Sequence, residues 1–85
     1  MLKVIMFTGN WCLPCKKFMP VVDSVVSQIS GVSLQKVDVD ANPELVSAYN
    51  ISSVPTLIFE KNGQVIGRAS TMSTQQLQST INKYL

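Results

Sequence analysis

Two cysteines separated by two residues, in the segment Cys12-Leu13-Pro14-Cys15, constrain this 85-residue chain more than any other feature. The short apolar segment before them, Leu2–Phe7, has the length of a buried strand and is followed by a Gly-Asn stop. In the segment after them, apolar residues recur every three or four positions, as in an amphipathic helix. A cysteine pair between a strand and a helix is typical of redox-active βαβ units. The pair therefore predicts an α/β fold built around it.

The helix that follows the cysteines is predicted to run from about Leu13 to Ile29, because its apolar residues form one stripe. This stripe contains Phe18, Val22, Val25 and Ile29, widened by Val21 and Val26. A strand over Val32–Val39 comes next, followed by a short helix near Glu44–Tyr49 with Asn42 as N-cap and Pro43 at its first position.

Two further strands are predicted over Thr56–Glu60 and Gln64–Ala69, joined by the hairpin turn Lys61-Asn62-Gly63. The last element is a helix that is capped by Ser73 or Thr74 and carries Leu77, Ile81 and Tyr84.

The resulting order, β-α-β-α-β-β-α, predicts a mixed four-stranded sheet with helices on both faces. The first two strands are joined by a long helix and should be parallel with a right-handed crossover. The last two strands form a hairpin and must be antiparallel. The chain contains no internal repeat, linker or low-complexity segment, so residues 1–85 are predicted to form a single domain.

Composition excludes several classes of protein. Hydrophobic residues make up 46% of the chain and charged residues 14%, which excludes intrinsic disorder. The net charge is +2 and no basic run occurs, so we expect no nucleic-acid partner. The longest apolar segments, Val4–Phe7 and Val54–Phe59, are too short to span a membrane. No signal-peptide cleavage pattern follows the N-terminus, and the chain is therefore expected to be cytoplasmic.

The sequence contains no histidine, which excludes a histidine-based catalytic dyad and a four-ligand Cys/His zinc site within one chain. At a helix N-terminus, unpaired amides and nearby Lys16 and Lys17 favour the thiolate, and such motifs have thiol pKa values of about 3.5–7.5. Cys12, at the tip of the helix, is predicted to be the attacking nucleophile. Cys15, one turn inside, is predicted to be the resolving thiol. Pro14 fits the first helical turn, whereas Pro20 should kink the helix.

Other interpretations of the cysteine pair remain open. A structural disulfide that closes so short a loop contributes only about 2 kcal/mol and is a poor stabiliser. A zinc or iron–sulfur site shared between two chains is a second alternative. A third is a redox-inert binding module that holds a partner protein in the groove around Trp11 and Pro55. The position of the pair behind a strand favours redox chemistry.

Several segments together resemble the thioredoxin family, in the same order and at nearly the same spacing. They are Trp11-Cys12-Leu13-Pro14-Cys15-Lys16 with Pro20 behind it, Val37-Asp38-Val39-Asp40-Ala41-Asn42-Pro43, Val54-Pro55-Thr56 with Phe59, and Lys61-Asn62-Gly63. The resemblance covers essentially the whole chain. It implies a thiol–disulfide oxidoreductase that reduces protein disulfides through a mixed disulfide, without a bound cofactor. A thioredoxin-reductase-like enzyme or a small thiol would recycle it, and the chain would be a monomer.

The resemblance also implies a substrate-binding surface around the sulfurs. The Val54–Pro55 bond would be cis and lie beside them, the backbone of Val54 would pair with an extended substrate, and Trp11, Leu13 and Pro14 would flank the site. On the residues alone, a trans Pro55 that starts the next strand is favoured, because cis is a small minority of X–Pro bonds. Plain packing is an equally reasonable interpretation of Trp11.

The chain departs from the family pattern at several positions. It lacks the family's first strand and helix, so Val32–Val39 should be a sheet edge. Met6 stands where the family has a buried carboxylate, and Lys36, without that partner, is interpreted as a solvated edge lysine. Leu13 replaces the usual glycine between the cysteines. The segment Arg68–Met72 lacks the glycine that normally follows the last strand. Phe7-Thr8-Gly9-Asn10 and the short length slightly favour a glutathione-dependent, glutaredoxin-like enzyme as an alternative, whereas Trp11 and Val54-Pro55-Thr56 favour a thioredoxin.

Overall fold

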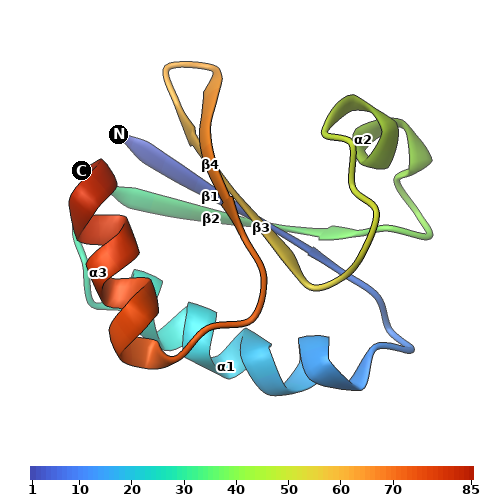
Figure 1. Cartoon of the computed structure of the whole chain (residues 1–85), viewed down its shortest axis with the longest axis horizontal. Coiled ribbons are helices and arrows are strands. Elements are labelled where there is room, and N and C mark those ends of the chain that lie inside the picture. The colour runs from blue at the N-terminus through green and yellow to red at the C-terminus, as the bar shows by residue number, and fades with distance from the viewer.

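The computed structural model describes all 85 residues and contains four strands and three helices (Figure 1). In chain order they are β1 (Leu2–Thr8), α1 (Leu13–Ser27), β2 (Val32–Asp38), α2 (Pro43–Ala48), β3 (Thr56–Lys61), β4 (Gln64–Ala69) and α3 (Thr74–Tyr84). The predicted order is confirmed, and each element ends within two residues of its predicted bounds. None of the three helices has the length and apolar character needed to cross a membrane.

The strands form one mixed sheet in the order β2-β1-β3-β4. β1 pairs with β2 in parallel and with β3 antiparallel, and β3 pairs with β4 antiparallel, with an irregularity between Phe59 and Glu60. These pairings confirm the predicted parallel first unit and antiparallel hairpin. They also confirm that β2 is an edge strand.

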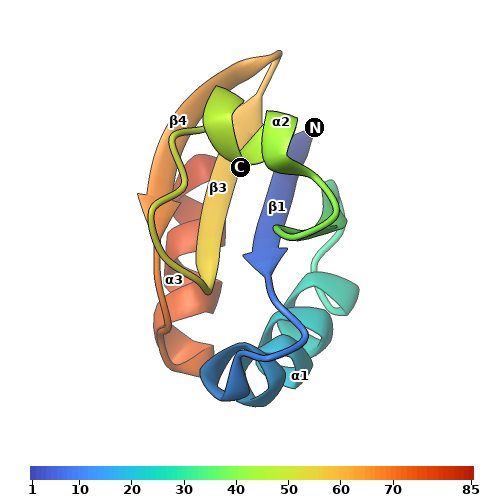
Figure 2. The same cartoon turned by 90° about the vertical axis from the view of Figure 1, so that its right-hand side faces the viewer.

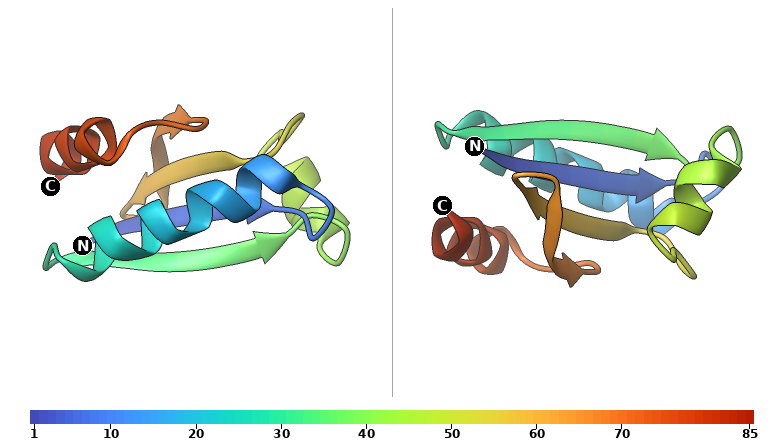
Figure 3. Two further views of the ribbon diagram at one scale, coloured as in Figure 1. Left: turned by 90° about the horizontal axis from the view of Figure 1, so that it is seen from below. Right: turned by 90° about the horizontal axis from the view of Figure 1, so that it is seen from above.

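Helices cover both faces of the sheet, as predicted. In Figure 1, α1 and α3 lie below the sheet and α2 lies above it, and Figures 2 and 3 show the same layers from other sides. The larger core lies between the sheet and the two long helices, and its buried residues are Leu2, Val4, Met6, Phe18, Val22, Val25, Leu57, Phe59, Leu77 and Ile81. A smaller cluster under α2 consists of Ile5, Phe7, Val37 and Ile58. The alternation of side chains along β1 separates these two clusters.

Local interactions set the ends of the helices. Ser73 caps α3 with a capping box: its Oγ accepts a bond from the Gln76 amide at 3.1 Å, and the Gln76 side chain accepts one from the Ser73 amide at 3.0 Å. Asn42 occupies the N-cap position of α2 as predicted, but its side chain does not cap the helix. It donates instead to the Asp38 carbonyl oxygen at 2.9 Å, which ties α2 to the end of β2.

Three segments meet at one end of the sheet: the carboxyl end of β1, the N-terminus of α1 and the loop before β3. β1 is the inner strand next to the edge and is hydrogen-bonded on both sides, so its carboxyl end is held firmly. α1 continues through Pro20, which is exposed on its outer side. The cysteine pair lies at this end of the sheet.

Candidate functional site

Cys12 and Cys15 are joined by a disulfide at the N-terminus of α1, with their Cα atoms 5.3 Å apart. Cys12 is the N-cap residue, and its Sγ accepts a hydrogen bond from the Cys15 amide at 3.2 Å. Cys12 is 5% exposed, whereas Cys15 is completely buried. The structure thus places the pair where the sequence predicted it, and Cys12 is the more accessible residue of the two.

The loop before β3 lies directly beside the disulfide. The Val54–Pro55 peptide bond is cis, as the family resemblance implied and contrary to the preference drawn from the residues alone. Pro55 is buried, and Cys12 Sγ lies 3.8 Å from the Val54 carbonyl oxygen. Two predicted site residues that are distant in sequence from the cysteines, Val54 and Pro55, are therefore brought next to Cys12.

Trp11 lies on the surface next to Cys12, with 66% of the residue exposed. Its indole Nε1 donates a hydrogen bond to Asp40 Oδ2 at 2.7 Å. The ring also lies against Gly9: a Cβ atom at that position would come within 2.8 Å of the ring. The carboxylate of Asp38 accepts a bond from the Asp40 amide at 3.0 Å and fixes the turn that carries Asp40. Trp11 is thus held in place at the rim of the site and is not a core residue.

Two largely apolar hollows flank the disulfide. The first, here called the Trp11 hollow, is lined by Trp11, Val39, Val46, Ile51, Ser52, Ser53 and Val54. The second, here called the Leu13 hollow, is lined by Leu13, Pro14, Lys17, Phe18, Val21, Thr71 and Met72. Leu13 itself is 61% exposed. The five predicted substrate-binding residues therefore all lie around the cysteine pair. Lys17 and Met72, which also line the Leu13 hollow, are not among the residues predicted from the sequence.

The interior beneath the cysteines contains no ionisable side chain. Met6 is completely buried within the larger core, and no polar or charged residue of the chain is buried. Lys36, which is exposed as predicted, is not simply solvated: its Nζ lies 2.9 and 3.1 Å from the two carboxylate oxygens of Asp23 on α1. Lys36, which the family resemblance placed near a buried carboxylate, thus pairs with Asp23 on the surface instead.

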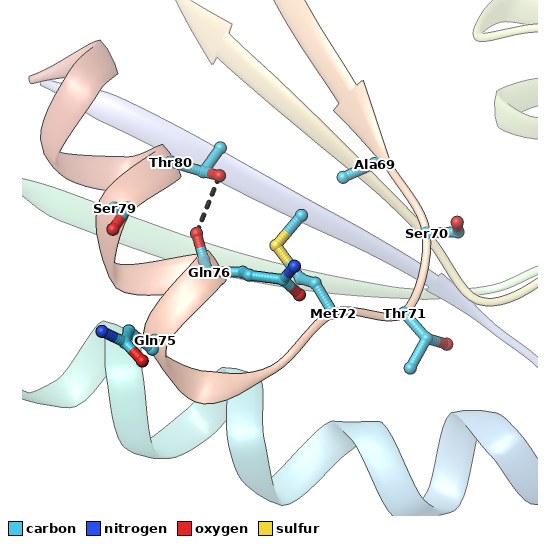
Figure 4. A pocket seen from close by; sticks show the side chains of 8 residues that line it. All are labelled: Ala69, Ser70, Thr71, Met72, Gln75, Gln76, Ser79 and Thr80. Atoms are coloured by element: carbon cyan, nitrogen blue, oxygen red, sulfur yellow. Dashed lines mark hydrogen bonds between the residues drawn. The ribbon is translucent and has the colours of Figure 1, made fainter.

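A third hollow lies between the end of β4 and α3 (Figure 4). It is lined by Ala69, Ser70, Thr71, Met72, Gln75, Gln76, Ser79 and Thr80. Hydroxyl and amide groups dominate this lining, and none of these side chains carries a charge. The hollow shares Thr71 and Met72 with the Leu13 hollow, so the two adjoin on the α3 side of the cysteines.

Comparisons with known proteins agree with this geometry. The family model described as Thioredoxin matches residues 1–83. The thioredoxin of Chlamydia trachomatis is 38% identical over 68 residues, which are 80% of this chain and 67% of that protein. The thioredoxin of Porphyra purpurea is 35% identical over 81 residues, which are 93% of this chain and 76% of that protein.

Solved structures resemble the whole fold. The thioredoxin of Fasciola hepatica has a TM-score of 0.91 and 34% identity, and the match covers 99% of this chain and 81% of that one. The Deadhead thioredoxin of Drosophila melanogaster has a TM-score of 0.90 and 28% identity over the same shares. These similarities confirm the fold predicted from the sequence.

Proposed function

The chain belongs to the thioredoxin family and is a thiol–disulfide oxidoreductase, and from that premise we propose that it reduces the disulfide bonds of protein substrates through Cys12 and Cys15, by way of a mixed disulfide. One observation carries the proposal: the two sulfurs are close enough to form a disulfide, yet only Cys12 is accessible. A substrate can therefore meet one cysteine, while the other is reserved for the second step.

In the first step, the reduced Cys12 attacks one sulfur of the substrate disulfide. Its thiolate is stabilised by the Cys15 amide, 3.2 Å away, and by the positive end of the α1 dipole. Lys16 and Lys17, both exposed on α1, add positive charge nearby. The attack forms a disulfide between Cys12 and the substrate, and the second substrate sulfur leaves as a thiolate.

In the second step, Cys15 loses its proton and attacks the Cys12 sulfur of the mixed disulfide. The bond to the substrate breaks, the second substrate thiol is released, and the Cys12–Cys15 disulfide forms. Two electrons have then passed from the cysteine pair to the substrate. Met6 occupies the interior where the family has a carboxylate, so water or the departing substrate thiolate accepts the Cys15 proton.

The substrate surface in this proposal consists of Trp11, Leu13, Pro14, Val54 and Pro55. The two large exposed apolar residues, Trp11 and Leu13, immediately precede and follow Cys12. Exposed apolar surface around a reactive group favours contact with a polypeptide. The Val54 carbonyl oxygen lies close enough to Cys12 for the backbone of an extended substrate to be held beside the nucleophile.

The mixed disulfide is tested with two single variants. Cys15→Ser should form a stable covalent adduct with a disulfide-bonded test protein, because the resolving thiol is missing. Cys12→Ser should form none, since the buried Cys15 cannot reach the substrate. Mass spectrometry after alkylation of free thiols distinguishes these outcomes. An adduct on Cys15 in preference to Cys12 would contradict the assigned roles, and equal binding of the test protein by the Cys12→Ser/Cys15→Ser double variant would favour the binding module.

A reductase or a small thiol would then recycle the disulfide, and a reducing compartment such as the cytoplasm would keep the pair supplied with electrons. The hollow in Figure 4 offers glutathione no ion pair, because no cationic side chain lines it, and Lys17 in the adjoining Leu13 hollow is the one cation that could meet a glutathione carboxylate there. The glutaredoxin-like alternative predicts reduction that saturates with glutathione concentration, whereas the proposed function predicts a rate that rises linearly with it.

A further inference from the structure

The Leu13 hollow combines an apolar lining with a single charge. Leu13, Pro14, Phe18 and Val21 form its α1 side, and Met72 reaches it from the segment between β4 and α3. Figure 4 shows that segment, with Met72 and Thr71 leading from β4 into α3. Lys17 is the only charged residue among the seven that line the hollow. Its volume, about 290 Å³, suits one large apolar side chain with room beside it.

The charge around the disulfide changes sign from one side to the other. On the Leu13 side, Lys17 lines the hollow. On the Trp11 side, Asp40 binds the indole and Asp38 lies behind it in the same turn. A negatively charged substrate segment would therefore be attracted to the Leu13 hollow and repelled from the Trp11 side.

We propose that the Leu13 hollow is a specificity subsite for protein disulfides in which a large apolar residue adjoins the reactive cysteine and an acidic residue follows it. This inference rests on the proposed function. Leu13 is covalently next to the nucleophile, so a residue adjacent to the substrate cysteine reaches the hollow while the sulfurs are in contact. Successive residues of an extended segment advance by about 3.3 Å and point to opposite faces, so the following carboxylate meets Lys17 at the rim of the hollow through the flexible side chains of both residues. The apolar side chain supplies affinity and the ion pair supplies selectivity.

The test uses three disulfide-bonded peptides of one sequence, which carry Leu-Glu, Leu-Lys or Gly-Glu after the cysteine. Hydroxyethyl disulfide, which is small and neutral, serves as a reference for the chemistry alone. The reduced protein is mixed with each disulfide, and the fluorescence of Trp11, the only tryptophan, reports the rate. We expect the Leu-Glu peptide to react about 5-fold faster than Leu-Lys at low ionic strength. We expect it to react about 10-fold faster than Gly-Glu. The charge preference should shrink in about 1 M NaCl.

Variants separate the subsite from the general charge of the helix. Lys17→Glu should reverse the preference between Leu-Glu and Leu-Lys. The matched control, Lys16→Glu, changes the same charge one residue away and outside the hollow, so it should leave that preference largely intact. Thr71→Lys, an exposed substitution on the opposite wall, should strengthen it. Each rate is divided by the rate of the same variant with hydroxyethyl disulfide, which removes effects on the thiolate.

The outcomes are distinct. The subsite is overturned if the wild-type protein reduces hydroxyethyl disulfide but treats the three peptides alike. It is equally overturned if Lys16→Glu and Lys17→Glu change the peptide preference to the same extent. If hydroxyethyl disulfide itself is not reduced, the proposed function fails, and the subsite fails with it.

Discussion

At the scale of single residues, the contact between Tyr49 and Glu60 links α2 to the sheet. The Tyr49 hydroxyl donates to Glu60 Oε2 at 2.6 Å, and its ring packs against Phe7 with centroids 5.6 Å apart. The hydrogen bond to Glu60, then burial and the charge of Glu60, raise the pKa of Tyr49 above its ordinary value of 10.0. Because the unfolded chain loses this proton first, the stabilisation is present below about pH 10 and is lost as pH rises through the pKa of the folded state.

Tyr49→Phe should therefore lower the free energy of unfolding by about 1 kcal/mol at neutral pH. The difference between wild type and variant should vanish as pH rises above about 10, where only the wild type loses the bond. Urea denaturation followed by circular dichroism at a series of pH values measures both curves. Tyr84→Phe is the matched control, because it removes the other tyrosine hydroxyl and leaves the Glu60 bond intact. A difference that persists unchanged at alkaline pH would contradict this account.

Asp40 is predicted to hold Trp11 at the rim of the site. Asp40→Ala removes the acceptor of the 2.7 Å indole bond and should let the exposed ring move, because only Gly9 then supports it. The fluorescence anisotropy of Trp11 should fall and the rate of reduction of a protein disulfide should drop about 5-fold, whereas stability should change by less than about 0.5 kcal/mol. Asp40→Asn retains an acceptor and should restore most of the anisotropy. Unchanged anisotropy in Asp40→Ala would show that Gly9 alone fixes the ring.

The positions of several site residues could be predicted from the sequence, and those of others could not. The position of the two cysteines at the N-terminus of α1 was predicted from their spacing together with the strand before them and the helix after them. The cis bond at Pro55 came only from the family resemblance, since the residues themselves favour trans. The contacts of Trp11 with Asp40 and of Lys36 with Asp23 join residues 29 and 13 positions apart, and no local pattern marks them.

At the scale of elements, α3 is held against the sheet by the close approach of Tyr84 to Gly67 on β4. A Cβ atom at Gly67 would overlap the Tyr84 ring, which packs on Phe59 with centroids 5.2 Å apart. Gly67→Ala should therefore displace the end of α3 and cost about 1–3 kcal/mol in the free energy of unfolding. Tyr84→Leu removes the ring that is in the way, so the double variant should lose less than the sum of the two single losses. If the two single losses of unfolding free energy add exactly in the double variant, the loss caused by Gly67→Ala arises within β4 and not from contact with Tyr84.

The elements themselves were predictable because apolar periodicity records which face of a helix or strand is buried. Their ends were less predictable, because periodicity does not record where the backbone leaves the helix. The apolar stripe of α1 continues to Ile29, which still packs against the core, but Gln28 already caps the helix. The N-cap of α3 was predicted to within one residue, as Ser73 or Thr74, because such side chains satisfy free amides locally, and the structure selects Ser73.

At the scale of the whole molecule, the arrangement of strands depends on contacts that no short segment contains. The central pairing joins β1 to β3, with Leu2 opposite Lys61, and the order β2-β1-β3-β4 follows from it. The sequence predicted the number and kind of strands and that β2 is an edge, the latter through the family resemblance. It did not reveal that the edge lysine, Lys36, would be bonded to Asp23, which fixes a charge along the exposed strand.

That fixed charge is predicted to keep the protein monomeric. An exposed strand edge pairs readily with other chains unless a charge discourages it, and Lys36 lies within β2 with its ammonium held at the surface. Lys36→Val should therefore favour association through β2, with dimers or larger species in sedimentation velocity at about 100 µM, where the wild type remains a monomer. Lys83→Val makes the same change in net charge on α3, outside β2, and should leave the protein monomeric. Because the Lys36–Asp23 pair is exposed and contributes at most about 1 kcal/mol to the free energy of unfolding, association of Lys36→Val cannot be attributed to unfolding. If Lys36→Val and Lys83→Val associate equally, the net charge of the protein, and not Lys36 on the β2 edge, keeps the chains apart.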